Sequence, residues 1–161
     1  MGARLQDKVA IITGAASGIG RGVAELFVSE GAKVIVADMN EEGGKAAVAE
    51  LGSNARFFKC DVTSEDSVKA MVDFAVSEFG KLDILHNNAG AFGARGAVEE
   101  IQVKDVDFTF ALLVRSVFLG CKHAAAQMRK QGHGGSIINT ASISATTPGY
   151  GPHVYQAAKA A

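Results

Sequence analysis

Cysteine, proline and tryptophan are the residues that this sequence has least of. Its 161 residues include two cysteines, two prolines and no tryptophan. Cys60 and Cys121 are too few for a disulfide framework, so we expect reduced thiols and a cytoplasmic location. A net charge of −1 gives no electrostatic reason to expect nucleic acid or a membrane surface as a partner. We expect no membrane partner for a second reason: no apolar signal core is present, and no apolar run approaches transmembrane length.

Short β-branched runs alternate along the chain with longer helical patterns. We expect strands over 8–13, 33–38, 55–62, 82–90 and 135–142, and helices over 18–31, 41–52, 64–80, 103–132 and from 154 onward. Such alternation requires a parallel sheet with right-handed crossovers and helices on both faces. The predicted fold is therefore α/β, a doubly wound parallel sheet. No composition shift marks a boundary, so residues 1–161 are predicted to form a single domain.

The first expected strand runs directly into the sequence TGAASGIG, which contains Gly14, Gly18 and Gly20. Glycine allows a sharp turn and a close approach of backbone to a pyrophosphate, and the following helix N-terminus offers free N–H groups. A glycine triplet placed between a strand and a helix favours a dinucleotide site. The alternative is a tight turn without a ligand.

Two carboxylates follow the next two strands. Asp38 ends the second strand, where a carboxylate can accept hydrogen bonds from both adenosine ribose hydroxyls and repel a 2′-phosphate. Met39 follows it, and no basic residue lies among residues 15–17, so NAD is favoured over NADP. Asp61 ends the third strand and is a candidate for contact with the adenine amino group. The alternatives are a solvated carboxylate at Asp38 and a helix cap at Asp61.

Tyr155 and Lys159 are four residues apart and therefore share one face of the last expected helix. A lysine one turn away favours a phenolate electrostatically. Tyr155 could then remove an alcohol proton as a hydride leaves, or return that proton in the reverse reaction. Taken alone, the pair also fits an ordinary amphipathic helix.

These motifs together resemble the classical short-chain dehydrogenase/reductase family in its NAD-dependent branch. The resemblance rests on TGAASGIG, on Asp61–Val62, on NNAG at 87–90, on YQAAK from Tyr155, and on Ser142 thirteen residues before that tyrosine. It implies a Rossmann-type sheet and Ser142, Tyr155 and Lys159 as the catalytic residues. The cofactor-binding residues that it implies are Gly14, Ser17, Gly18, Ile19, Gly20, Asp38, Asp61, Val62, Asn88, Ala89, Gly90, Tyr155 and Lys159.

The resemblance also implies an activity and partners. The expected reaction is hydride transfer between NAD(H) and a secondary alcohol or ketone, with no metal. Ile143, Pro148 and Tyr150 in the loop after the serine suggest an apolar, cyclic substrate. Family members commonly form homodimers or homotetramers through the long helix, which is apolar here on more than one face.

The sequence departs from the family pattern at three points. Leu113 occupies the position of the family's catalytic asparagine, which holds a water that links the lysine to solvent. His86 replaces an aliphatic residue in the fourth strand, and we interpret it as a core histidine with satisfied hydrogen bonds. Family chains run roughly half as long again, so we expect the N-terminal part of a longer enzyme. The alternatives are an NAD-binding module without turnover and a dehydratase or epimerase relative.

Overall fold

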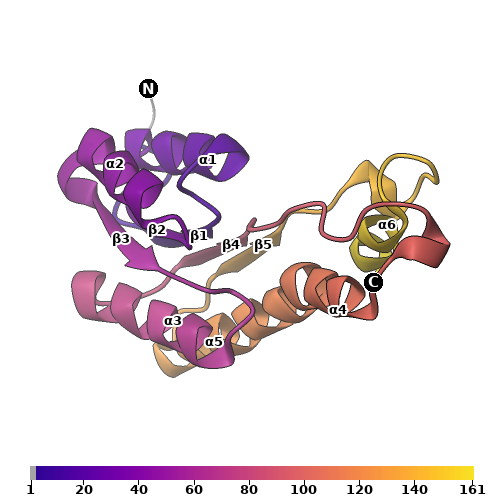
Figure 1. Cartoon of the computed structure of the whole chain (residues 1–161). Helices are drawn as coiled ribbons and strands as arrows, with labels where there is room; N and C mark the ends of the chain where they lie inside the picture. Colours follow the sequence, from indigo (N-terminus) through magenta and orange to yellow (C-terminus); the bar gives the residue numbers. More distant parts are fainter. Residues whose placement is uncertain (1–2) are drawn as a thin grey trace.

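The computed structural model describes residues 3–161, which form a five-stranded parallel sheet flanked by helices (Figure 1). The strand order is β3-β2-β1-β4-β5, and every neighbouring pair is parallel. The strands are β1 (Val9–Thr13), β2 (Lys33–Asp38), β3 (Ala55–Lys59), β4 (Ile84–Asn87) and β5 (Ser136–Asn139). The helices are α1 (Gly18–Ser29), α2 (Glu41–Leu51), α3 (Glu65–Phe79), α4 (Val103–Phe110), α5 (Ser116–Lys130) and α6 (His153–Ala160). The predicted fold class is confirmed.

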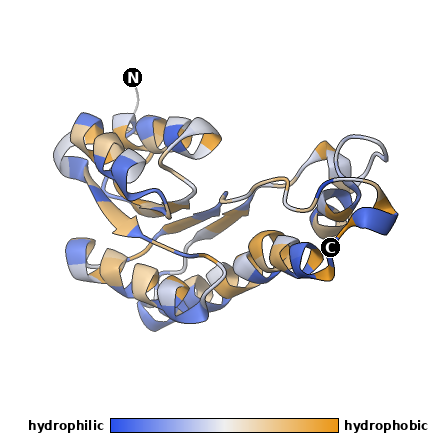
Figure 2. Cartoon of the chain, viewed as in Figure 1, coloured by the Kyte–Doolittle hydropathy of each residue, from blue (hydrophilic) through white to orange (hydrophobic). Residues whose placement is uncertain are grey.

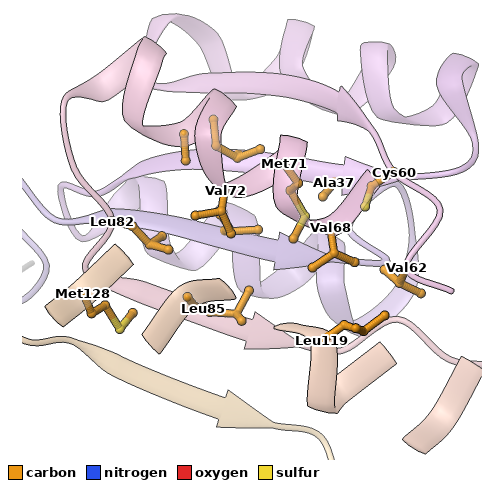
Figure 3. Close-up of a cluster of buried hydrophobic side chains, with 14 residues drawn as sticks. Ala37, Cys60, Val62, Val68, Met71, Val72, Leu82, Leu85, Leu119 and Met128 are labelled. Atoms are coloured by element: carbon orange, nitrogen blue, oxygen red, sulfur yellow. The ribbon is translucent and has the colours of Figure 1, made fainter. Parts of the chain in front are cut away.

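The sheet is covered on both faces. Helices α1 and α2 lie over one face, and α3 and α5 lie over the other (Figure 1). Alternate residues of β1 enter different cores: Ile11 joins the α3–α5 side, and Ile12 joins the α1–α2 side. Figure 3 shows the first of these clusters, where Leu85 of β4 lies among side chains of α3 and α5. Burial on both faces explains why these strands are continuous apolar runs.

Three strands end earlier than the sequence pattern predicts. β3 ends at Lys59 instead of residue 62, β4 ends at Asn87 instead of residue 90, and β5 ends at Asn139 instead of residue 142. After β4, the Asn88 and Ala89 backbone N–H groups donate to the side-chain hydroxyl of Thr13, the last residue of β1. The segments that follow β1, β3 and β4 line the site described below.

The long apolar stretch predicted as a helix over 103–132 is one continuous helix, Val103–Lys130, with a π-helical turn inside it. This turn, Ala111–Arg115, lies between α4 and α5. By length and composition alone, Val103–Lys130 meets the criteria for a membrane span, so the expectation that no segment does so was wrong. The core helix of a non-membrane protein passes the same test, and this one packs against α3 and β4. Its ribbon carries both polar and apolar residues (Figure 2).

Helix α6 lies beside α4, away from α1 and α2 (Figure 1). Strand β5 is at the edge of the sheet, next to β4, and its Ile138 side chain is 41% exposed. An edge strand of this kind presents backbone groups that have no strand partner on one side.

Candidate cofactor and active site

The glycines of the loop after β1 are required by close packing. Gly14 has φ +66°, and a Cβ there would lie 2.8 Å from the Ala89 Cα atom. A Cβ on Gly20 would overlap the Gly14 carbonyl oxygen and the Asn88 amide. These two glycines therefore allow the loop to lie directly on the chain that follows β4.

Gly18 is different, because a Cβ built on it meets nothing within 4 Å. Its φ is +56°, and it begins α1, whose N-cap Ser17 makes no side-chain cap hydrogen bond. The first N–H groups of a helix have no partner within the helix, and the helix dipole favours negative charge at this end. The loop thus leaves an open backbone cradle of the kind that holds a pyrophosphate.

Thr13 ties this cradle to the NNAG segment. Its hydroxyl oxygen accepts hydrogen bonds from the backbone N–H of Asn88, at 2.9 Å, and of Ala89, at 3.0 Å. The Asn88 side-chain amide in turn donates to the Thr13 carbonyl oxygen at 2.9 Å. The sequence pattern predicts Thr13 as the last residue of the strand over 8–13 but assigns its side chain no contact.

Asp38 and Asp61 both make local hydrogen bonds. The Asp38 carboxylate accepts from the N–H of Ala16 at 3.0 Å and from the N–H of Asn40 at 2.9 Å, one to each oxygen. One oxygen of Asp61 accepts from both the N–H and the hydroxyl of Thr63. Each carboxylate oxygen can accept more than one bond, so these contacts orient both groups and leave acceptor capacity for a ligand.

One cavity of about 590 Å³ collects most of the predicted residues. This volume is within the usual range for small-molecule and cofactor sites. Eleven of the thirteen predicted cofactor-binding residues line it: Gly14, Ser17, Gly18, Ile19, Gly20, Asp38, Asp61, Val62, Asn88, Ala89 and Gly90. The prediction did not include seven further lining residues: Ala37, Met39, Cys60, Thr63, Ala91, Phe108 and Leu112.

Tyr155 and Lys159 lie outside this lining, on α6. The Lys159 ammonium is 5.9 Å from the centre of the Tyr155 ring, so the helix brings the two together as predicted. Lys159 donates a 2.7 Å hydrogen bond to the Thr140 carbonyl oxygen, and burial lowers the pKa of its ammonium. Phe92 packs against Tyr155. The two rings meet edge-to-face, with their centroids 5.1 Å apart.

Ser142 has a local role in the structure. Its hydroxyl oxygen accepts a 3.1 Å hydrogen bond from the Ser144 backbone N–H, as the N-cap of a short helical turn. A hydroxyl that accepts one bond still has its own proton to donate. The loop that follows exposes apolar surface, because Ile143 and Tyr150 are each 61% exposed.

Leu113 and His86, the two residues that depart from the family pattern, are both buried. Leu113 lies in the π-helical turn, and its Cδ2 atom would be 3.1 Å from a Cβ on Gly90. His86 was expected to have satisfied hydrogen bonds, which is half wrong. Its Nε2 lies 2.9 Å from the Thr140 hydroxyl, but its Nδ1 is buried without a partner among residues 3–161. Burial lowers the pKa of the His86 ring.

Within residues 3–161, no group of three metal-ligating side chains occurs.

Comparison with known proteins identifies the family. The family model described as short chain dehydrogenase matches residues 8–161. The chain therefore belongs to the classical short-chain dehydrogenase/reductase family of oxidoreductases. Short-chain dehydrogenase reductase 3a of Arabidopsis thaliana is 43% identical over 159 residues, which make up 98% of this chain and 62% of that protein. Secoisolariciresinol dehydrogenase of Forsythia intermedia is 46% identical over 158 residues, covering 97% of this chain and 57% of that protein. The chain thus spans about three fifths of the length of such relatives.

Solved structures agree in fold. The 3-ketoacyl-(acyl-carrier-protein) reductase of Brucella melitensis, complexed with NADH, superposes with a TM-score of 0.92 at 35% identity. The match covers 97% of this chain and 66% of that one. A short-chain dehydrogenase/reductase of Burkholderia phymatum in complex with NAD gives the same TM-score and identity over 97% of this chain and 56% of that one.

Proposed function

We propose that this chain supplies the cofactor site and the acid–base residues of an oxidoreductase that transfers a hydride between NAD(H) and a secondary alcohol or ketone. The observation that carries the proposal is that one cavity is lined by eleven of the residues that the family motifs mark for the cofactor. The Tyr155–Lys159 pair on α6 supplies the chemistry that such a cavity alone would lack.

The residues fit the cofactor group by group. The open backbone at Gly18 and the start of α1 would hold the pyrophosphate, and Asp38 would accept from the adenosine ribose hydroxyls. A carboxylate at that place repels a 2′-phosphate, which supports NAD over NADP. Asp61 and Val62 would lie at the adenine, with Ala89 and Gly90 at the second ribose.

The acid–base chemistry falls to three side chains. Bound NAD(H) accepts or supplies the hydride. Tyr155 takes the alcohol proton during oxidation and gives it back during reduction, and the Lys159 ammonium stabilises the phenolate. Lys159 would also hold the ribose nearest the reaction. Ser142 would donate its free hydroxyl proton to the substrate oxygen and so orient the substrate.

A test of this function starts with the substitution Tyr155→Phe. We expect NADH formation from a panel of secondary alcohols to be lost in this variant while NADH binding persists. The panel should include apolar cyclic alcohols, which the exposed Ile143, Pro148 and Tyr150 favour, and short hydroxy acids as the contrast. Absence of turnover by the parent protein, in whatever length its source cell makes it, would contradict the enzyme assignment.

Leu113 favours a second function, an NAD-binding module without turnover. Leucine cannot hold the water that the family's asparagine binds near the lysine. NADH binding without turnover by any form would support this alternative. Measuring the intact mass of the protein made by its source cell would show whether a longer chain exists.

The apolar outer side of the long helix supports a homodimer or homotetramer as the assembled form of the enzyme. Phe110, Val114 and Phe118 line a surface groove of about 660 Å³, and Phe118 is 67% exposed. Arg115 and Asp107 border this groove and could pair across a twofold axis. Light scattering should give a multiple of the chain mass for the parent protein and the single mass for Phe118→Glu.

A further inference from the structure

His86 is a buried, titratable side chain that the mechanism above does not use. It lies in β4, one residue from Leu85, which faces α3 and α5, so the ring faces the α1 side of the sheet. Its Nε2 reaches the hydroxyl of Thr140, which is 54 residues away in the sequence and follows β5. The contact therefore joins the end of β4 to the residue that follows β5.

Both backbone polar groups of Thr140 are hydrogen-bonded. Its N–H donates to the Asn87 carbonyl oxygen at 3.0 Å, and its own carbonyl oxygen accepts from Lys159 at 2.7 Å. Its hydroxyl lies 3.4 Å from the side-chain oxygen of Asn88. One residue thus connects the lysine of α6, the asparagine of the cofactor cavity and the ring of His86.

The hydrogen bonds of this group have a definite direction. The Asn88 amide nitrogen donates to the carbonyl oxygens of Thr13 and Gly14, which leaves the Asn88 side-chain oxygen facing Thr140. That oxygen can only accept, so the Thr140 hydroxyl must donate to it. The same hydroxyl must then accept from His86, which requires the ring to carry its proton on Nε2.

The unpartnered Nδ1 agrees with this assignment. In the neutral, Nε2-protonated ring, Nδ1 holds a lone pair and no hydrogen. A charged ring would place a second N–H in a buried position that offers no acceptor among residues 3–161, at the cost of an unmade hydrogen bond.

We propose that His86 is a positioning residue: through the Thr140 hydroxyl it holds Lys159 and Asn88 in a fixed relation to each other. The inference rests on the proposed function, since Lys159 and Asn88 are both among the residues assigned to the cofactor. Leu113 in the long helix cannot hold the water that the family's asparagine binds near the lysine. In this chain the Lys159 ammonium is instead anchored by its hydrogen bond to the Thr140 carbonyl oxygen.

Nuclear magnetic resonance of the histidine rings tests the geometry without any activity. Long-range ¹H–¹⁵N correlation should show His86 neutral at pH 7 with the proton on Nε2. Exposed His153 in the same sample serves as the internal reference for an unconstrained ring. A His86 ring protonated on Nδ1, or on both nitrogens, would overturn the proposal.

Variants test the positioning role through NADH affinity, measured by fluorescence titration. His86→Val and Thr140→Val should each weaken binding by roughly three- to tenfold, the equivalent of one lost hydrogen bond. The double variant should lose no more than Thr140→Val alone, because removal of the Thr140 hydroxyl already removes the contact with His86. His86→Gln, whose amide can reach the position of Nε2, should restore affinity to within about twofold of the parent.

A matched control is His86→Asn, whose shorter side chain places its amide near the Nδ1 position and away from Thr140. It should bind NADH as weakly as His86→Val, and circular dichroism should show all variants folded. Parent-like affinity in His86→Val and Thr140→Val would overturn the positioning role. Failure of the parent protein to bind NADH would instead overturn the proposed function, and the ring tautomer would still decide the hydrogen-bond chain.

Discussion

The Leu113 side chain packs directly against the backbone of Gly90, so closely that a Cβ on this glycine would lie 3.1 Å from Leu113 Cδ2. Leu113 is buried in the π-helical turn, and Gly90 lines the cofactor cavity. The residue that replaces the family's asparagine therefore supports the wall of the cofactor site from behind.

We expect Leu113→Ala to lower the free energy of unfolding by about 2–4 kcal/mol, because it leaves a cavity in a packed region. It should also weaken NADH binding by loosening Gly90. Leu26→Ala, on the outer side of α1 where Leu26 is 51% exposed, is the matched control. It should change stability by less than about 0.5 kcal/mol. Equal losses for the two variants in urea denaturation would contradict the packing role of Leu113.

Gly18→Ala should weaken NADH binding far more than it weakens the fold. Gly18 and Gly52 both have positive φ and open space where a Cβ would lie, but only Gly18 is at the cavity. Alanine at either site should cost about 1–3 kcal/mol of stability through backbone strain. Calorimetric titration should show reduced NADH affinity for Gly18→Ala alone, whereas similar affinities for both variants would place the pyrophosphate elsewhere.

Asp38→Ala should reduce the preference for NADH over NADPH. Removal of the carboxylate deletes the repulsion of a 2′-phosphate and the acceptor for the ribose hydroxyls. We expect the ratio of the two dissociation constants to shift toward NADPH by at least about tenfold, or 1.4 kcal/mol. Asp66→Ala, in the first turn of α3, is a control outside the cavity. An unchanged ratio in Asp38→Ala would remove the argument for NAD.

The pH dependence of stability should carry a contribution from His86. Burial lowers the pKa of this ring below its ordinary value of 6.5. Below that pH the unfolded chain binds a proton on His86 that the native protein does not, so the native state loses stability as the pH falls, by at most about 1.4 kcal/mol per pH unit. His86→Gln should therefore lose less stability than the parent between pH 7 and 5, whereas exposed His153→Gln should not differ from the parent.

The pattern of strands and glycines was enough to predict the α/β class and Gly14, Gly18, Gly20 and Asp38 of the cavity, whereas the other predicted lining residues depended on the family resemblance. The class and the four named residues depend on local signals, such as a strand that ends in Asp38 or a glycine that must approach a neighbouring chain. The contacts around Lys159 were beyond such reasoning. Its partner Thr140 and the neighbour Phe92 of Tyr155 are brought near by the packing of β5, α4 and α6, for which the sequence has no periodic signal. The π-helical turn was also missed, because its apolar residues read as continuous helix.

The close fit of Gly14 to Ala89 connects ligand affinity with folding. Strands β1 and β4 are neighbours in the sheet but are separated in the sequence by two complete β-α units, so their pairing is a long-range contact. The cavity depends on that pairing, because Gly14, which follows β1, and Asn88, which follows β4, both line it. A dinucleotide that binds there should therefore stabilise the β1–β4 pairing, and it should slow hydrogen exchange of those β4 amides that exchange through opening of the site by a factor of up to about 1 + L/Kd, where L is the free ligand concentration.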